Sequence, residues 1–139
     1  MTHRVYFSLG TNLGDKEHNI HEAIRRMGEL IGDVERQSAL HTTEPWGFQS
    51  ENTFVNAAVS CLTTLSPRQV LETTQQIERE MGRTGKSANG EYHDRIIDID
   101  ILFYDNLQLD EEDLKIPHPL MHERDFVMKP LMEIWNKKC

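Results

Sequence analysis

The chain has 139 residues, of which 37% are hydrophobic, so it is long enough to bury one core and we expect a single domain over residues 1–139. A formal net charge of −8 argues against a general binder of nucleic acid or of anionic membranes. Two cysteines, no apolar run of membrane-spanning length and no signal-peptide pattern favour a soluble protein of the reducing cytoplasm.

The first part of the chain predicts a strand, a turn and a helix. Residues 5–9 have the composition of a short strand, and the glycine-containing segment 10–15 follows it. Its spacing matches neither G-x-G-x-x-G nor the P-loop signature, so a tight turn is favoured over a phosphate cradle. A helix then ends at Gly32, a residue suited to the position after a C-cap. Its apolar stripe comprises Ile20, Ala23, Ile24, Met27, Leu30 and Ile31.

The middle of the chain predicts two further strands and a second helix. The strands are expected at residues 34–41 and 54–62, with a long loop at 42–53 between them. Ser66 provides an N-cap for the second helix, and the proline after it occupies the first helical position. The helix stops at Gly82. The apolar face of this helix comprises Val70, Leu71, Ile77 and Met81.

After a polar loop over residues 83–94, the segment 94–103 is rich in β-branched residues and predicts a strand. The resulting order βαββαβ indicates an α+β fold of the ferredoxin-like kind, an antiparallel sheet with helices packed on one face. A hairpin-like stretch at 107–116 and a terminal helical segment that contains Pro130 complete the chain.

The most informative motif is the D-x-D pair in this last strand. Because strand side chains alternate, Asp98 and Asp100 share one face, roughly 7 Å apart, while Ile99 and its neighbours Ile97 and Ile101 point into the core. Two carboxylates in an apolar segment repel each other unless a cation lies between them. Mg²⁺ brought in by a nucleotide fits this oxygen-only pair. The alternative is an edge strand whose polar face is merely solvated.

Basic residues flank the aspartate strand in an otherwise acidic chain. They are Arg83, Lys86, Arg95, His118 and Arg124, and they could hold a polyphosphate against the metal. Any of them could instead be a solvated charge or, for the histidine, a core or capping residue. The polar loop before the strand has the composition of a mobile lid. No H-E-x-x-H pattern is present, so structural zinc is disfavoured.

Aromatic and amide side chains suggest a site for a flat ring. Trp46, Phe54 and Phe126 could stack on a heteroaromatic ligand, although such residues more often belong to a core. Asn56 lies in an apolar strand and needs hydrogen-bond partners, which a pterin or purine edge, or the backbone, could provide.

Taken in order, these motifs resemble the 6-hydroxymethyl-7,8-dihydropterin pyrophosphokinase family of folate biosynthesis over nearly the whole chain. The matching blocks are residues 9–15, 43–47, 54–58, 77–83, 94–102, 117–119 and 124–126. The D-x-D strand preceded by arginine and followed by Pro-His-Pro is the most specific part of the resemblance. It implies transfer of the pyrophosphoryl group of ATP to the pterin hydroxymethyl group, with AMP as the other product.

The resemblance also implies the role of each site residue. The catalytic residues would be Arg83, Arg95, Asp98 and Asp100, with two Mg²⁺ ions held by Asp98 and Asp100. The ATP-binding residues would be Arg83, Lys86, Arg95, Ile101, Leu114, Lys115, His118 and Arg124. The pterin-binding residues would be Thr43, Pro45, Trp46, Phe54, Asn56, Tyr92 and Phe126.

Pro119 departs from the resemblance, because some members have an aromatic residue after the histidine. We expect a monomer with small-molecule substrates and neither nucleic acid nor a membrane as partner. Two alternatives remain open at this point. One is a non-catalytic ferredoxin-like module that binds a nucleotide, and the other is a kinase that transfers only the γ-phosphoryl group and releases ADP.

Overall fold

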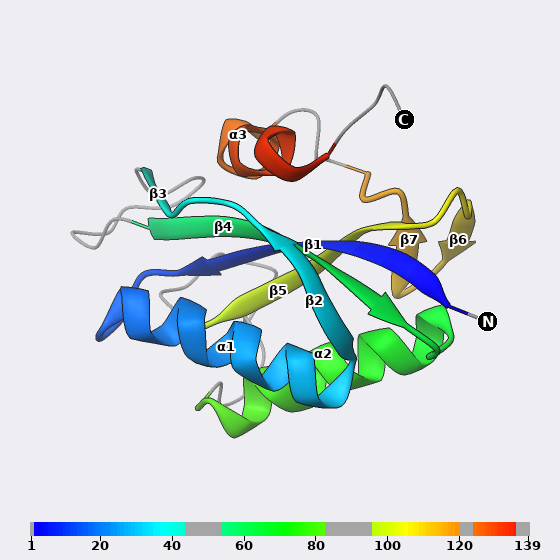
Figure 1. Cartoon of the computed structure of the whole chain (residues 1–139), viewed down its shortest axis with the longest axis horizontal. Helices are drawn as coiled ribbons and strands as arrows, with labels where there is room; N and C mark the ends of the chain where they lie inside the picture. Colours follow the sequence, from blue (N-terminus) through cyan, green and yellow to red (C-terminus); the bar gives the residue numbers. More distant parts are fainter. Residues whose placement is uncertain (1, 44–53, 83–95, 120–123, 136–139) are drawn as a thin grey trace.

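The computed structural model describes residues 2–43, 54–82, 96–119 and 124–135 (Figure 1). In chain order its elements are β1 (His3–Thr11), α1 (Lys16–Leu30), β2 (Gly32–Gln37), β3 (His41–Thr43), β4 (Phe54–Thr63), α2 (Pro67–Glu80), β5 (Asp98–Tyr104), β6 (Leu109–Glu111), β7 (Leu114–Ile116) and α3 (Asp125–Ile134).

The main sheet is antiparallel and has the strand order β2-β4-β1-β5, with β3 pairing with β4. Helices α1 and α2 cover one face of this sheet, and α3 lies on the other (Figure 1). The expected α+β, ferredoxin-like fold is therefore confirmed. The terminal helix was also expected, but its place on the face opposite α1 and α2 was not.

Local signals in the sequence set the helix ends. The Asp15 carboxylate caps α1 by accepting from the His18 amide at 3.1 Å, and the Ser66 capping box with Gln69 opens α2. After α1, a Cβ at Gly32 would lie 1.9 Å from the Leu62 carbonyl oxygen. Only glycine lets the chain leave the helix and pass this close to β4.

Two apolar clusters fill the layers. The larger lies between the sheet and helices α1 and α2, and the smaller lies between the sheet and α3. The predicted stripe of α1 is buried at Ile20, Ala23 and Met27. The prediction was wrong for Leu30, which is 42% exposed, whereas Ile31 at the C-cap is buried and continues the buried stripe.

The strand expected at residues 34–41 is in fact two strands, β2 and β3, and β3 includes Thr42 and Thr43, which were expected to belong to a loop. The reason is tertiary. The amide of Ala39 donates to the Glu133 carboxylate of α3 at 2.8 Å rather than to a neighbouring strand. The periodicity of residues 34–41 contains no sign of this competing acceptor. In the described part of the chain, no helix is long and apolar enough to cross a membrane.

Candidate active site

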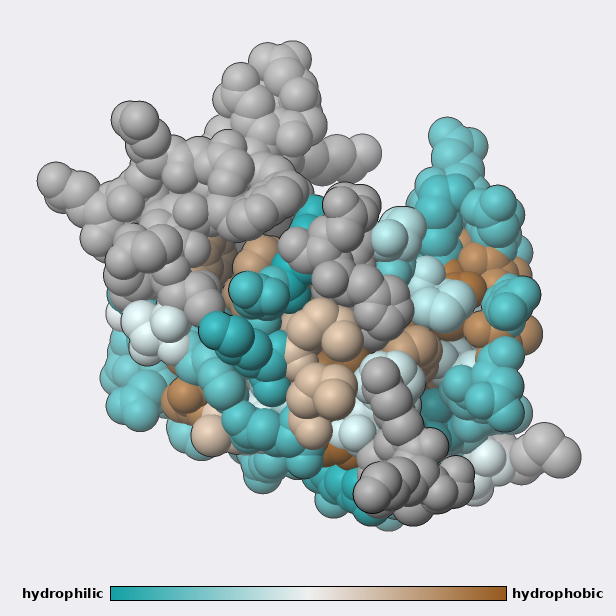
Figure 2. Space-filling model, turned by 90° about the horizontal axis from the view of Figure 1, so that it is seen from above, coloured by the Kyte–Doolittle hydropathy of each residue, from teal (hydrophilic) through white to brown (hydrophobic). Residues whose placement is uncertain are grey.

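The predicted orientation of the aspartate strand is confirmed. In β5, Ile99 and Ile101 join the core under the sheet, so Asp98 and Asp100 lie on the opposite face, the one that carries α3. Both aspartates are partly exposed. Figure 2 looks onto this side of the molecule, where hydrophobic groups lie among hydrophilic ones. The carboxylates are therefore accessible to a ligand and are backed by a rigid sheet.

Strand pairing brings a second group to the same face. Asp98 pairs with Gly10 of β1, and Gly10 pairs in turn with Asn56 of β4. The three residues form one row across the sheet, which places Asn56 two strand spacings from Asp98, or roughly 10 Å. Asn56 is only 3% exposed. A buried amide and a partly exposed carboxylate thus bound one surface.

Gly10 makes room in this row. A Cβ at Gly10 would lie 3.0 Å from Oδ1 of Asn56 and 3.8 Å from Cδ1 of Phe54. The glycine therefore lets the amide and the aromatic ring lie directly over the backbone of β1. Gly10 was predicted only as part of a turn. Its role was missed because its position opposite Asn56 is visible only from the pairing of β1 with β4.

His118 and Arg124 approach the aspartates from the segments after β7 and before α3. The His118 amide donates to the Leu102 carbonyl of β5 at 3.1 Å, which holds this segment against the strand. Burial, followed by the charge of Arg124, lowers the pKa of the His118 imidazole, and Asp98 opposes both effects. The Arg124 guanidinium lies 5.7 Å from the centre of the Phe126 ring. His118, Arg124, Phe126 and Asp98 therefore belong to one site.

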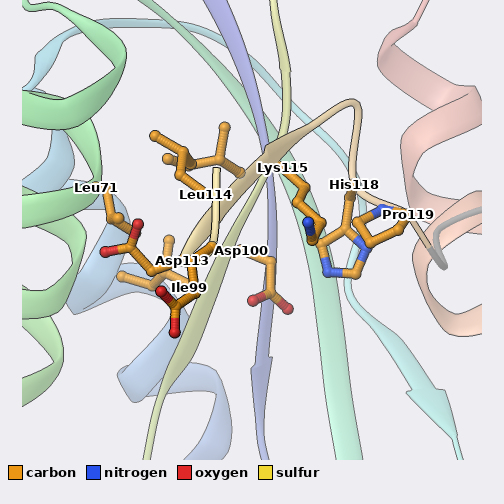
Figure 3. Close-up of a pocket in the computed structure, with 10 residues that line it drawn as sticks. Leu71, Ile99, Asp100, Asp113, Leu114, Lys115, His118 and Pro119 are labelled. Atoms are coloured by element: carbon orange, nitrogen blue, oxygen red, sulfur yellow. The ribbon is translucent and has the colours of Figure 1, made fainter. Parts of the chain in front are cut away.

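A pocket of about 260 Å³ opens beside Asp100 (Figure 3). Its lining residues are Leu71, Ile99, Asp100, Ile101, Glu112, Asp113, Leu114, Lys115, His118 and Pro119. In Figure 3, Leu71 and Asp113 lie toward one end, Lys115 and His118 toward the other, and Asp100 between them. The pocket thus combines apolar side chains, three carboxylates and two nitrogen-bearing side chains.

The pocket gathers several predicted residues and adds others. It brings Asp100, predicted to hold a metal, together with four residues predicted to bind ATP: Ile101, Leu114, Lys115 and His118. The sequence analysis placed Leu71 and Ile99 in the core and gave no role to Glu112 or Asp113. A leucine on the edge of a helix stripe carries no signal that separates a core contact from a pocket wall.

Ion pairs shape the acidic turn of the pocket. Lys115 pairs with Asp110 at 2.5 Å across the β6–β7 hairpin. Arg68 of α2 pairs with Glu111 and also with Asp113, at 2.7 Å. The hydrogen bond from Arg68 lowers the pKa of the Asp113 carboxyl. The two pairs of Arg68 join the hairpin to α2, which forms the facing wall of the pocket.

Several predicted site residues lie outside the described residues. They are Arg83, Lys86, Arg95, Pro45, Trp46 and Tyr92. Thr43 is the last residue of β3, but its side chain is also outside what the structure describes.

The metal-binding side chains that the structure describes fit Mg²⁺ better than they fit a metal ion bound only by protein ligands. In the described ranges, no group of three or more histidine, cysteine, aspartate or glutamate side chains could hold a metal ion. A pair of carboxylates on one face is typical of Mg²⁺ sites, where water and substrate phosphates complete the octahedron. Asp98 and Asp100 could hold Mg²⁺ in this way.

The fold and this site define a class: a ferredoxin-like α+β protein with a carboxylate pair beside a pocket lined by both apolar and charged side chains, suited to a metal–nucleotide substrate. The model of the 7,8-dihydro-6-hydroxymethylpterin-pyrophosphokinase (HPPK) family matches residues 6–136, and the chain belongs to this family. It is a pyrophosphokinase of folate biosynthesis.

Individual relatives agree with this assignment. The chain is 45% identical over 131 residues to the 2-amino-4-hydroxy-6-hydroxymethyldihydropteridine pyrophosphokinase of Porphyromonas gingivalis, covering 94% of this chain and 89% of the relative. It is 38% identical over 135 residues to the Bacillus subtilis enzyme of the same name, covering 96% and 79% of the two chains. A crystal structure of an HPPK-DHPS in complex with substrates superposes with a TM-score of 0.72 at 16% identity, over 96% of this chain and 40% of that one, and supports the fold.

Proposed function

We propose that residues 1–139 form a single domain in which Mg-ATP and 6-hydroxymethyl-7,8-dihydropterin bind side by side on the α3 face of the sheet. The observation that carries this proposal is the row of Asn56, Gly10 and Asp98 across three paired strands. It places a group that can read a ring edge next to a group that can hold a metal. The hydroxymethyl oxygen attacks the β-phosphorus of ATP and the bond from this phosphorus to the oxygen shared with the α-phosphate breaks. AMP leaves with that oxygen, and the hydroxyl proton passes to solvent.

ATP occupies the pocket beside Asp100. The adenine lies against Ile101 and Leu114, which line the pocket. The triphosphate extends toward Lys115 and His118, which lie together at one end of it (Figure 3). The guanidinium of Arg124 completes the described basic groups. Lys86 and the two arginines Arg83 and Arg95 are assigned to the same triphosphate by their match to the family motif.

Asp98 and Asp100 would hold two Mg²⁺ ions. When bound, these ions would neutralise charge on the transferring group and on its leaving oxygen. The protein contributes a fixed carboxylate pair, because both aspartates belong to a paired strand rather than to a loop. Arg83 and Arg95 are the catalytic arginines of this proposal.

The pterin lies over Gly10. Asn56 offers both donors and an acceptor to the edge of the ring, and Phe54 and Phe126 stack on its faces. The backbone near Thr43, Pro45 and Trp46 reads the remaining edge, and Tyr92 covers the site.

The proposal includes a monomer in the cytoplasm that needs only these two small-molecule substrates. Size-exclusion chromatography with light scattering checks the oligomeric state.

The experiment that tests the function is incubation with Mg-ATP and 6-hydroxymethyl-7,8-dihydropterin, followed by chromatographic separation of the nucleotides. We expect AMP and pterin pyrophosphate in equal amounts, and no product after a chelator removes Mg²⁺. ADP in place of AMP would make the protein a γ-phosphoryl kinase. Bound ATP without turnover would favour a binding module.

A further inference from the structure

One buried carboxylate contacts the aspartate strand from the side opposite its sheet partner. The Ile99 amide, between Asp98 and Asp100, donates to Oε2 of Glu78 at 2.8 Å. Glu78 belongs to α2 and is only 7% exposed. β5 is the last strand in the sheet order and pairs with β1, so the Ile99 amide is on its outer edge.

The ladder geometry gives this contact its meaning. In an antiparallel pair, the backbone groups of successive residues point alternately toward the partner strand and away from it. Because the Ile99 amide points to Glu78, the backbone groups of Asp98 and Asp100 point to β1, opposite Gly10 and Ser8. Helix α2 therefore holds the central residue of the D-x-D motif, while β1 holds the two aspartates.

A simple structural role explains the choice of residue poorly. Glu78 lies on the buried face of α2 with Val70, Thr74 and Ile77, where an ionised carboxylate costs free energy unless it is well bonded. A bond from a backbone amide to a carboxylate is stronger than one between neutral groups. Glu78 also lies just before the end of α2, so it links that end to the start of β5. In the sequence, α2 comes before Arg83 and β5 comes after Arg95.

We propose that Glu78 is a positioning residue for the metal site. By fixing Ile99, it fixes the height and spacing of the Asp98 and Asp100 carboxylates above the sheet. This inference rests on the proposed role of the aspartates in holding Mg²⁺.

The first test measures metal binding without turnover. Mn²⁺ is titrated in the presence of α,β-methylene-ATP and detected by electron paramagnetic resonance, for the wild type, Glu78→Ala, Glu78→Asp and Glu78→Gln. We expect Glu78→Ala and the shorter Glu78→Asp to weaken Mn²⁺ binding by about tenfold or more. Glu78→Gln, which retains an acceptor oxygen, should stay within about threefold of the wild type. Glu72→Ala, on the exposed side of the same helix, is the matched control.

The second test is independent of metal and activity. Amide hydrogen exchange of Ile99 should accelerate in Glu78→Ala and Glu78→Asp but not in Glu78→Gln. Exchange rates are compared after correction for any difference in global stability between the variants. Unchanged Mn²⁺ affinity in Glu78→Asp would overturn the proposal, as would a loss confined to the affinity for the nucleotide analogue. If the wild type fails to make AMP, the proposed reaction fails, and these two measurements still decide the role of Glu78.

Discussion

Asp98 and Asp100 are the residues on which the proposed chemistry depends most. Replacing either with asparagine keeps the size of the side chain but removes a charge from the metal site. We expect kcat to fall by at least about a hundredfold for Asp98→Asn and for Asp100→Asn, with an unchanged melting temperature within a few degrees. Steady-state kinetics at saturating Mg²⁺ and thermal unfolding monitored by circular dichroism measure the two effects.

The control for this prediction is Asp33→Asn, which changes an exposed carboxylate of β2 at the opposite edge of the sheet. It should leave kcat unchanged. Full activity of both Asp98→Asn and Asp100→Asn at high Mg²⁺ would contradict the metal role.

Gly10 tests the pterin side of the site. An added methyl group would come within 3.0 Å of Oδ1 of Asn56, so the amide must move by a few tenths of an ångström. We expect Gly10→Ala to raise the KM for the pterin by about tenfold and to leave the KM for ATP unchanged, because the displaced amide lies on the pterin side only.

Gly28→Ala is the matched glycine. Gly28 is inside α1, where a new Cβ would make an ordinary 3.7 Å contact with Val34, so this variant should retain activity and gain up to about 1 kcal/mol of stability. Equal effects of the Gly10 and Gly28 substitutions on the pterin KM would refute the assignment.

At the scale of elements, the β6–β7 hairpin and α2 form facing walls of the pocket, and Arg68 joins them through Glu111 and Asp113. Arg68 also offsets the negative charge of a turn that borders the site for a polyanion. We expect Arg68→Ala to raise the KM for ATP about three- to tenfold with little change in kcat, since exposed ion pairs contribute modestly and the network contains two.

The effect of Arg68→Ala should diminish at high salt, which screens exposed charges. Arg25→Ala provides the control, because Arg25 forms two exposed ion pairs on α1, with Glu22 and Glu29, away from the residues that line the pocket. A KM for ATP that is the same in both variants would show that the ion pairs of Arg68 do not affect ATP binding.

Helix α3 is tied to the sheet by Glu133, which accepts from the Ala39 amide and pairs with His41 at 2.5 Å. The Ala39 bond, followed by the His41 bond, lowers the pKa of Glu133. The carboxylate therefore binds a proton less readily in the folded state. Its stabilisation is present above the unfolded pKa of 4.5 and is lost as the pH falls through the folded pKa.

We expect Glu133→Gln to reduce the free energy of unfolding by about 1 kcal/mol at pH 7, a value discounted for the partial exposure of the group. The difference from the wild type should shrink steadily below pH 4.5. Urea unfolding at a series of pH values measures it, and a difference that stays constant down to pH 3 would contradict the assignment.

At the scale of the whole molecule, Cys61 reports on the integrity of the larger core. Its side chain is fully buried in β4, and burial raises the pKa of its thiol to about 12. In a Cys139→Ser background, we expect the thiol to react with a disulfide reagent at least about a thousandfold more slowly in the native protein than in denaturant. Rapid labelling of the native protein would show that the sheet opens locally rather than as a unit.

The features that could be predicted from the amino-acid sequence are those that depend on neighbouring residues. Capping at Ser66, the end of the first helix at Gly32 and the alternation that places both aspartates on one face all follow from local geometry. The resemblance in motif order supplied the family. These predictions succeeded because hydrogen bonds and side-chain directions within one element are set over a few residues.

Tertiary structure decided which of these features meet. The register that aligns Asn56, Gly10 and Asp98, the use of Leu71 as a pocket wall and the bond from Ile99 to Glu78 all join segments far apart in the chain. The same is true of the contact with Glu133 that separates β2 from β3. Each depends on which surfaces pack together when the core forms. Residue periodicity shows that a face will be buried, but it does not identify the partner that buries it.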